Sequence, residues 1–259
     1  MQFTVVIPTR NPHRGRLERT VAALARQTLP ASEWELILVD NGSSPPLGSE
    51  VISGIPARAR LLREETPGAS SARLAGISAA EGADFVFVDD DNELAPDYLT
   101  VAADFLANHP SVAAIGGRII GEFDQPPAPW AQPHSGLLAL RDFGSEAVIS
   151  RPGEDEVSFP WFAPFGAGLV MRGEGARHYQ AWCSSNAFFN CRTEGRLGGC
   201  GDTEMVIVGA LRKGRGVAYV PELSLVHLIP SQRSTFRYLC RLAFSCGLDW
   251  GRLAVSQGY

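Results

Sequence analysis

The chain has 259 residues, of which 45% are hydrophobic and 20% are charged, and its formal net charge is −5. This composition is typical of a globular protein and excludes an intrinsically disordered chain, a collagen-like repeat and a disulfide scaffold. The acidic balance also argues against a nonspecific nucleic-acid binder, which usually carries a basic excess. The N-terminus lacks the basic segment of a signal peptide, and no apolar run reaches the roughly 18 residues of a membrane-spanning helix. We therefore expect a cytoplasmic protein.

The first ninety residues alternate predicted strands and helices. Four short apolar runs predict strands: 3–7, 34–39, 59–62 and 85–88. Two segments between them have apolar residues at helical spacing and predict helices: 15–27 and 70–80. Apolar strands that alternate with helices favour a mostly parallel sheet covered on both faces.

The rest of the chain predicts a second set of elements around an irregular segment. In chain order, these are a helix at 96–107, a strand at 112–120, a structured stretch at 165–171, a helix at 202–211, two strands at 217–220 and 223–226, and a helix at 235–248. Six prolines between 121 and 160 prevent any long element there. Such an excursion often shapes the substrate pocket of an enzyme. The five cysteines show no CxxC spacing, so we expect free thiols rather than a zinc site.

Polar segments follow three of the predicted strands. They are Pro8-Thr9-Arg10-Asn11, Asp40-Asn41-Gly42-Ser43 and Asp89-Asp90-Asp91. Ligands bind beyond the carboxyl ends of the strands in open parallel sheets. The sequence therefore predicts a binding site where these three segments meet.

The three adjacent carboxylates of Asp89, Asp90 and Asp91 are the strongest single signal. They repel one another, and a fold does not require them. At a strand end they would supply oxygen ligands for Mg²⁺ or Mn²⁺, which takes one or two carboxylates together with phosphate oxygens and water. A solvated acidic turn is the alternative interpretation.

Three further positions near the strand ends suit a nucleotide. The segment after the first strand offers a hydroxyl, a guanidinium and an amide, although such a turn is also a common loop. Asp40 either caps a turn or accepts hydrogen bonds from a base ring. Arg73 follows a run of small residues that lets a ligand approach, and a surface arginine is the alternative.

Two later residues are candidates for catalysis or metal binding. Asp202 follows a glycine-rich turn and could act as a general base, but an acidic residue also stabilises a helix N-terminus. His227 follows a predicted strand and becomes a metal-ligand candidate only because a carboxylate site is predicted nearby. A structural histidine is the more common case.

The motifs together resemble the family 2 glycosyltransferases, which have the GT-A fold. The resemblance rests on Val5–Asn11, Leu38–Ser43 and Phe87–Asp91, followed in order by Gly166–Gly168, Gly198–Glu204 and Val226-His227. It extends from residue 2 to about residue 248. It implies one α/β domain with a nucleotide-sugar-binding half at 1–120 and an acceptor-binding half at 121–259.

The resemblance also implies an activity and a set of site residues. The activity is an inverting, metal-assisted transfer of a sugar from a nucleoside diphosphate sugar, most commonly UDP-linked, to a carbohydrate or lipid-linked acceptor in cell-envelope or polysaccharide biosynthesis. The implied nucleotide-sugar ligands are Pro8, Thr9, Arg10, Asn11, Asp40, Gly42, Arg73, Asp89 and Asp90. The implied sugar or acceptor cleft comprises Gly166, Ala167, Gly168 and Gly201. The implied metal ligands are Asp91 and His227, and the implied base is Asp202, with Glu204 as the fallback.

One departure from the family pattern keeps other interpretations open. The usual Glu-Asp pair before the base is Gly201-Asp202 here, which retains the aspartate and lacks the glutamate. A nucleotidyltransferase and a non-catalytic sugar-nucleotide-binding module are the alternatives.

Arg237, Arg241 and Arg252 could approach a membrane surface or an acidic acceptor, or could simply be solvated. The sequence does not fix the oligomeric state.

Overall fold

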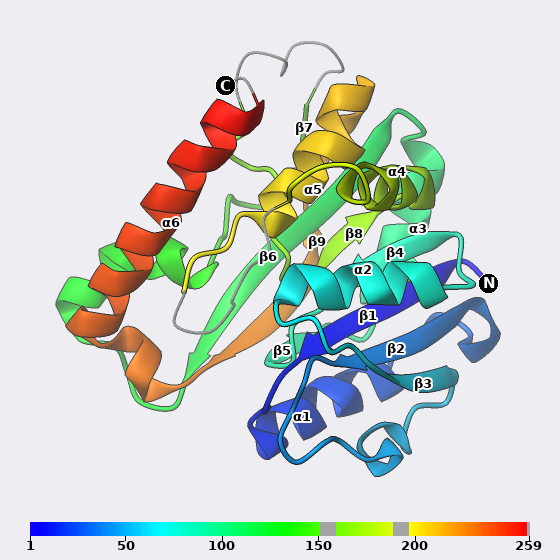
Figure 1. Ribbon diagram of the computed structural model, residues 1–259, viewed down its shortest axis with the longest axis horizontal. Coiled ribbons are helices and arrows are strands. Elements are labelled where there is room, and N and C mark those ends of the chain that lie inside the picture. Colours follow the sequence, from blue (N-terminus) through cyan, green and yellow to red (C-terminus); the bar gives the residue numbers. More distant parts are fainter. Residues whose placement is uncertain (151–158, 189–196, 258–259) are drawn as a thin grey trace.

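The computed structural model describes residues 1–150, 159–188 and 197–257, which form a central sheet with helices on both faces (Figure 1). The strands are β1 (Phe3–Thr9), β2 (Trp34–Asp40), β3 (Arg58–Arg63), β4 (Asp84–Phe87), β5 (Asn92–Leu94), β6 (Val112–Phe123), β7 (Val148–Ile149), β8 (Leu169–Met171) and β9 (Gly216–Ile229). The α-helices are α1 (Arg14–Ala25), α2 (Ala69–Ala79), α3 (Tyr98–Asn108), α4 (Gly173–Cys183), α5 (Gly201–Gly209) and α6 (Phe236–Gln257). Short 3₁₀ turns are η1 (Ala31–Glu33), η2 (Ser49–Ile52), η3 (Pro129–Leu138), η4 (Leu211–Lys213) and η5 (Ser231–Ser234).

The N-terminal half is the predicted parallel sheet. β1 lies between β2 and β4, and β3 flanks β2, all in parallel. Every residue of β1 and β2 is buried, because α1 and α2 cover opposite faces. Val5 packs in the same cluster as Leu17 of α1, whereas Val6 packs in the same cluster as Ile77 of α2. Burial on both faces explains why these strands are continuous apolar runs.

The other half of the sheet is mixed rather than mostly parallel. Among the described strands the order is β3-β2-β1-β4-β8-β6-β9-β5, and β7 pairs with β9. β8 is antiparallel to both β4 and β6, and β5 and β7 are antiparallel to β9. Within this half of the described sheet, β6 and β9 pair in parallel. Strand direction depends on chain connections that apolar runs do not encode, so the sequence did not predict these antiparallel pairs.

The two strands predicted at 217–220 and 223–226 are one continuous strand, β9. The gap between the two predicted ranges includes Pro221, which cannot donate to a strand ladder. The pairing with β6 instead shifts register around this point, from Gly116 opposite Tyr219 to Arg118 opposite Ser224. This irregularity accommodates Pro221, so the strand continues to Ile229.

Other elements also differ from the predicted ranges. The prediction omits α4, whose first turn contains the small residues Gly173, Gly175 and Ala176. A Cβ at Gly175 would lie 2.5 Å from the carbonyl oxygen of Gly209, so these two glycines allow α4 and α5 to pack at backbone distance. α6 extends nine residues past the predicted end at 248, to Gln257. β6 extends into the irregular segment as far as Phe123, and residues 124–150 hold only η3 and β7.

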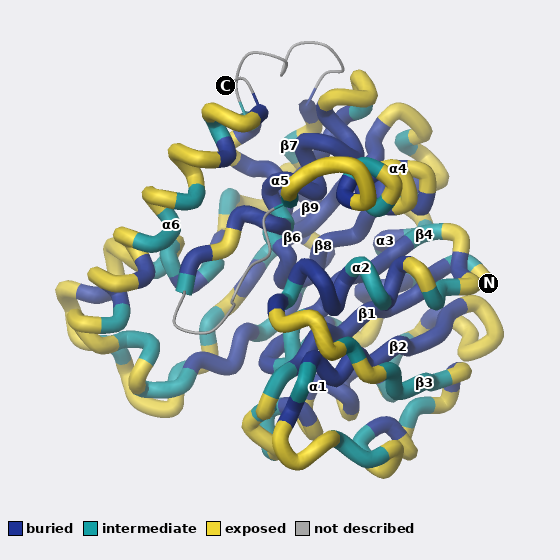
Figure 2. Tube along the Cα trace, viewed as in Figure 1, coloured by how far each residue is buried: buried dark blue, intermediate teal, exposed yellow. Residues whose placement is uncertain are grey.

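The burial pattern shows where the sheet and its helices form the core (Figure 2). The central strands are buried, and the outward faces of the helices are exposed. The predicted division at residue 120 falls inside β6, so one sheet runs through both halves and the division stays a prediction. None of the described helices is long and apolar enough to cross a bilayer. No disulfide joins Cys183, Cys200, Cys240 and Cys246 to one another, and Cys191 lies outside the described residues.

Candidate active site

The three polar strand ends meet at one cavity. Thr9 and Asp40 pair in register at the ends of β1 and β2, and the acid triplet follows β4 on the other side of β1. The cavity has a volume of about 690 Å³. Its lining includes eleven of the residues singled out from the sequence: Pro8, Thr9, Arg10, Arg73, Asp89, Asp90, Asp91, Gly166, Ala167, Asp202 and His227.

Asn11, Asp40 and Gly42 organise the loops behind the cavity rather than lining it. The Asn11 backbone N–H donates to Ser43 Oγ at 2.8 Å, and Asn11 Oδ1 accepts from the Ser44 N–H at 2.9 Å. Asp40 accepts hydrogen bonds from the Ser43 N–H and from Arg63 Nη1, at 2.9 and 2.7 Å. Burial opposes ionisation of Asp40, but these hydrogen bonds outweigh it and lower its pKa. Asp40 therefore holds the loop as a carboxylate.

Each carboxylate of the acid triplet has a partner from a different element. Asp89 accepts from Arg73 Nη2 at 3.0 Å, and Asp90 accepts from the hydroxyl of Thr9. Asp91 accepts from Arg233 Nη1 at 2.9 Å. Burial and the neighbouring charge of Asp91 raise the pKa of Asp90 to about 6. Each carboxylate of the triplet is therefore hydrogen-bonded within the protein, so the triplet is not a solvated turn.

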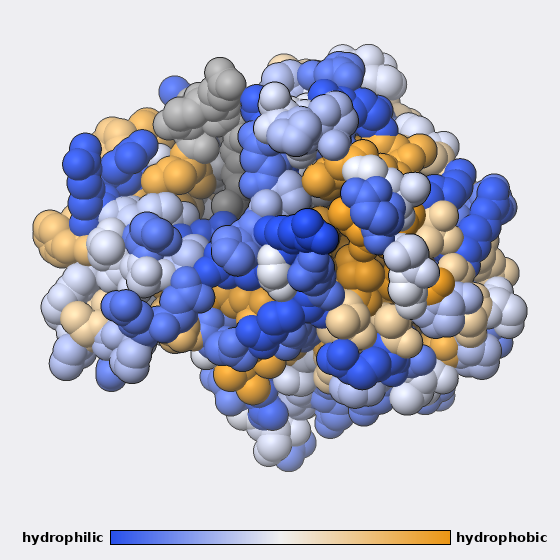
Figure 3. All heavy atoms as spheres, turned by 90° about the horizontal axis from the view of Figure 1, so that it is seen from below, coloured by the Kyte–Doolittle hydropathy of each residue, from blue (hydrophilic) through white to orange (hydrophobic). Residues whose placement is uncertain are grey.

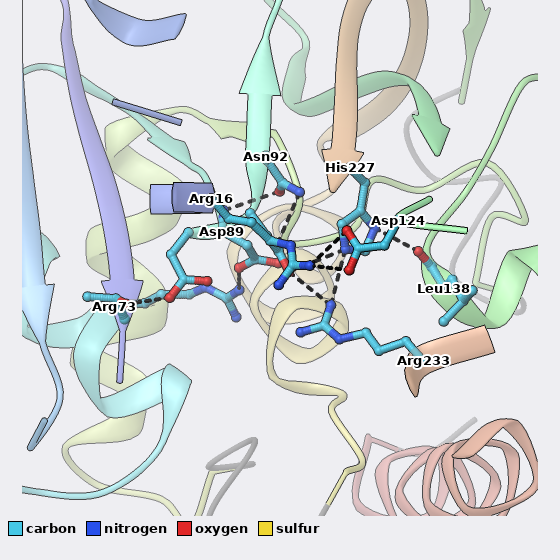
Figure 4. Close-up of polar contacts among 11 residues, drawn as sticks. Arg16, Arg73, Asp89, Asn92, Asp124, Leu138, His227 and Arg233 are labelled. Carbon is cyan, nitrogen blue, oxygen red and sulfur yellow. Dashed lines mark hydrogen bonds and ion pairs between the residues drawn. The ribbon is translucent and has the colours of Figure 1, made fainter. Parts of the chain in front are cut away.

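His227 faces Asp91 across the sheet. Asn92, which follows Asp91, pairs with His227 in the β5–β9 ladder. His227 Nε2 lies 3.5 Å from Asp91 Oδ2, and its Nδ1 lies 3.0 Å from the carbonyl oxygen of Leu138 (Figure 4). The carbonyl can only accept, so Nδ1 carries the proton, and Arg233 Nη1, which can only donate, lies 3.2 Å from Nε2. A carbonyl partner on the other ring nitrogen is also what orients a metal-binding histidine.

These two side chains fit part of a divalent cation site. One carboxylate oxygen and one imidazole nitrogen face the same point, and phosphate oxygens and water usually complete such a site. No group of three or more His, Cys, Asp or Glu side chains with metal-binding geometry occurs in the described parts of the chain. A cation here would therefore depend on ligands from a bound molecule.

Asp202 lies at the start of α5 and reaches the cavity. Its Oδ2 accepts from the Gly166 N–H at 2.7 Å, and its Oδ1 accepts from the Thr203 N–H at 2.8 Å. A Cβ at Gly166 would lie 2.6 Å from Arg73 Nη2 and 3.2 Å from Asp202 Oδ2. Glycine at position 166 therefore lets the basic and the acidic side chain approach the same point.

The fallback base, Glu204, is part of the core. It is 1% exposed, and its Oε2 accepts a hydrogen bond from the Tyr179 hydroxyl at 3.0 Å. It is not among the residues that line the cavity within the described structure. Gly168 and Gly201 are likewise buried beside the cavity. Gly168 has a φ of +79°, and its carbonyl accepts from the Tyr98 hydroxyl at 2.6 Å.

Part of the cavity lining is aromatic or apolar. It is formed by the segment around Trp161 and Phe165 and by α6, which contributes Tyr238, Leu242 and Trp250. The prediction anticipated that residues of 121–160 would shape a pocket, and 136–139 and 159–160 do line it. The part played by α6 was not anticipated.

Sequence reasoning also missed two arginines. Arg233 lies in η5 and contacts both Asp91 and His227. Arg141 is buried, donates to the carbonyl of Ala163 at 2.9 Å and lies 4.0 Å from the ring centroid of Phe165. Burial lowers the pKa of Arg141 to about 10, against the opposing effect of the Asp202 charge. Neither arginine belongs to a local motif, so only the fold reveals them.

Residues 4–167 match the profile of the family described as glycosyl transferase family 2. The chain belongs to this family. A stretch of 114 residues is 27% identical to the poly(ribitol-phosphate) beta-N-acetylglucosaminyltransferase TarS of Staphylococcus aureus, in strains Mu50 and MW2. That stretch covers 43% of this chain and 20% of each relative.

Solved structures of S. aureus TarS residues 1–349 share the fold. The complex with UDP-GlcNAc has a TM-score of 0.59 at 17% identity over 88% of this chain and 58% of that one. The complex with UDP has a TM-score of 0.57 at 17% identity, over 95% and 65%. The chain therefore spans less than two thirds of these relatives. The likeness confirms the predicted GT-A fold.

Proposed function

We propose that this chain transfers a sugar from a nucleoside diphosphate sugar to an acceptor hydroxyl. The observation that carries the proposal is the convergence of three polar strand ends and Asp202 on one cavity that aromatic side chains also line. The family membership of residues 4–167 agrees with it. Because the similar TarS structures contain UDP-GlcNAc or UDP, we choose UDP as the nucleotide to test first.

The residues at the strand ends suit the diphosphate part of such a donor. Arg10 and Arg73 bring guanidinium groups to the cavity, and arginine pairs well with phosphate oxygens. Asp91 and His227 would hold Mg²⁺ or Mn²⁺. When bound, this cation would act as a Lewis acid that neutralises charge on the departing diphosphate.

Asp202 is the proposed general base. It would accept the proton of the acceptor hydroxyl while that oxygen attacks the anomeric carbon from the face opposite the diphosphate. The new glycosidic C–O bond forms as the C–O bond to the diphosphate breaks, so a single displacement inverts the configuration. The Gly166 N–H holds the carboxylate in place at 2.7 Å. General-base catalysis of this kind typically contributes about 10²–10⁴-fold.

The aromatic part of the lining suits a carbohydrate or lipid-linked acceptor. Trp161 is 66% exposed, and Trp250 packs edge-on against Phe159 with 5.5 Å between ring centroids. Flat aromatic faces of this kind can cover the apolar face of a sugar ring while its hydroxyls remain solvated. The TarS relatives are named for a poly(ribitol phosphate) acceptor, which supports a role in the synthesis of a cell-envelope polymer or another polysaccharide.

We further propose that α6 brings the protein to the surface of an anionic membrane. Phe236, Cys240, Phe244 and Leu248 recur every four residues and are all exposed, so they form one apolar stripe on the outer face of α6. Leu239, Leu242 and Leu253 on its inner face pack against the body of the protein. A few hydrophobic atoms lie among hydrophilic ones at the left margin of Figure 3, the side on which Figure 1 draws α6.

Charge on α6 favours lipid over a second copy of this chain. Arg237 and Arg241 are exposed and each follows a residue of the apolar stripe, and Arg252 is exposed farther along the helix. An apolar stripe bordered by arginines is typical of helices that lie in the interface of anionic bilayers. A second copy would bring two sets of these arginines together, and like charges repel.

Calorimetric titration with nucleoside diphosphates tests the proposed donor site. We expect UDP to bind in the presence of Mn²⁺ and to bind far more weakly in a chelator. Arg73→Met removes the guanidinium that contacts Asp89 and should weaken UDP binding. Arg118→Met is the matched control, because Arg118 forms an ion pair with Asp142 outside the cavity. Failure of every diphosphate to bind to folded protein would contradict the proposal.

A further inference from the structure

One nitrogen of Arg233 contacts both candidate metal ligands. Its Nη1 lies 2.9 Å from Asp91 Oδ2 and 3.2 Å from His227 Nε2 (Figure 4). The two ligand atoms are themselves 3.5 Å apart. A guanidinium N–H therefore takes the place between a carboxylate and an imidazole that a divalent cation would require.

The protonation of His227 agrees with this arrangement. Nδ1 donates to the carbonyl of Leu138 at 3.0 Å, and Arg233 Nη1, which can only donate, lies 3.2 Å from Nε2, so Nε2 accepts with its lone pair. Nε2 is thus in the state that a metal requires of a histidine ligand. The guanidinium uses the same lone pair, so Arg233 and a metal cannot both bind it.

Asp91 and His227 lie in a rigid part of the protein, whereas Arg233 lies on a short connecting turn. Asp91 and His227 are both more than nine-tenths buried. They are held through the sheet, where the Leu228 N–H donates to the Asp91 carbonyl at 2.8 Å. Arg233 belongs to η5, a single 3₁₀ turn between β9 and α6, and its side chain is 24% exposed. The frame of the site can stay fixed while the guanidinium leaves.

We propose that Arg233 is an internal cation that occupies the metal position until a nucleotide diphosphate arrives. The inference rests on the proposed function, since it concerns the same donor site. A divalent cation alone must displace the guanidinium from Asp91 without giving it a new partner. A diphosphate offers that partner, because Arg233 already lines the cavity and arginine binds phosphate oxygens well. Metal and nucleotide therefore bind cooperatively, and Arg233 is the positioning residue that couples them.

Binding of Mn²⁺ in the absence of nucleotide tests this coupling without any measurement of activity. The free Mn²⁺ signal in electron paramagnetic resonance would be followed in the wild type and in Arg233→Met, Arg233→Lys and Arg118→Met. Met retains the length of the side chain but cannot donate. We expect Arg233→Met to bind Mn²⁺ about ten- to a hundredfold more tightly than the wild type, the range for loss of a hydrogen bond to a charged group. Arg233→Lys and the control Arg118→Met should stay near the wild type.

Two further measurements show that the change in Mn²⁺ affinity arises at Asp91 and separate it from the proposed function. Asp91→Asn in the Arg233→Met background should abolish the gained affinity, and thermal melts would show that each variant is folded. UDP should tighten Mn²⁺ binding more in the wild type than in Arg233→Met. The inference is wrong if Arg233→Met binds Mn²⁺ no more tightly than the wild type, or if neither protein binds it. If UDP binds neither protein, the proposed function fails, but the nucleotide-free comparison still decides the role of Arg233.

Discussion

The backbone N–H of Gly166 donates to Oδ2 of Asp202 at 2.7 Å, across 36 positions in the chain. This contact fixes the carboxylate in the wall of the cavity. It also places Gly166 so close to Arg73 that a Cβ added here would lie 2.6 Å from Arg73 Nη2. The proposed base, the loop that holds it and a basic residue of the proposed donor site are thus coupled through one glycine.

Asp202→Asn should abolish most sugar transfer while leaving UDP binding unchanged. The amide retains the shape of the side chain but cannot accept the proton of the acceptor hydroxyl, so we expect kcat to fall about 10²–10⁴-fold. Glu204→Gln is the comparison. It should lower the melting temperature, because the Tyr179 hydroxyl loses a charged acceptor, with little change in kcat. The reverse pattern would identify Glu204 as the base.

Gly166→Ala should impair transfer without unfolding the protein. The added methyl group would lie 2.6 Å from Arg73 Nη2 and would displace either Arg73 or Asp202. A misplacement of about 1 Å commonly costs on the order of 10²-fold in rate. Gly136→Ala is the matched control, since Gly136 also lines the cavity and a Cβ added there would have nothing within 4 Å. Equal effects of the two substitutions on initial rates would contradict the geometry.

Glu35→Gln should lower the stability of the fold. It should also make that stability depend less on acid pH. Glu35 is fully buried and accepts from Thr4 Oγ1, Arg60 Nη2 and the Glu81 N–H at 2.7–2.8 Å. Burial raises its pKa, but these hydrogen bonds outweigh burial and lower the pKa below the usual 4.5. The carboxylate therefore stabilises the fold above its unfolded pKa, and this contribution is lost as the pH falls through the folded pKa.

Chemical denaturation at several pH values would measure the Glu35 effect. We expect a loss of about 2–4 kcal/mol at pH 7, because a partly buried arginine partner remains without its carboxylate. The difference between variant and wild type should shrink as the pH falls below about 4.5. Glu33→Gln, at an exposed position in η1, should change stability by less than about 0.5 kcal/mol at either pH. A difference that is constant with pH would contradict the assignment.

Cys183 should resist alkylation under conditions in which Cys240 reacts. Burial raises the pKa of the Cys183 thiol to about 11, so only about one molecule in a thousand is the reactive thiolate at pH 8. Cys240 is exposed on α6. Mass spectrometry after brief treatment with iodoacetamide would quantify both sites, and denatured protein should label at both. Rapid labelling of Cys183 in the folded protein would contradict its burial.

Removing the apolar stripe of α6 should weaken binding to anionic vesicles. Phe236 and Phe244 are 69% and 71% exposed, and burying an aromatic side chain contributes about 1.5–3 kcal/mol. The double variant Phe236→Ser, Phe244→Ser should therefore bind vesicles with phosphatidylglycerol at least about tenfold more weakly in a sedimentation assay. Ile149→Ser, an exposed apolar residue of β7, is the control. If the wild type binds neutral and anionic vesicles equally, or neither, the proposed membrane contact is wrong.

Local sequence determined the N-terminal half of the fold and eleven of the residues that line the cavity. Strands buried on both faces, such as β1 and β2, must be apolar throughout, and a polar residue at their ends is then conspicuous. Thr9, Asp89 and Asp91 could be named for this reason, because adjacent parallel strands place their carboxyl ends together. The register of Thr9 against Asp40 shows that the ends of β1 and β2 do meet.

Only the tertiary structure decided which of these residues face the cavity and what completes it. Asp40 and Glu204 are carboxylates like Asp91 and Asp202, but their hydrogen bonds point into a loop and into the core. Arg233 lies 142 residues from Asp91 along the chain, and no local pattern links them. The connections between strands and helices bring side chains such as Arg233 and Asp91 together. A local sequence pattern does not predict contacts between residues that are far apart in the chain.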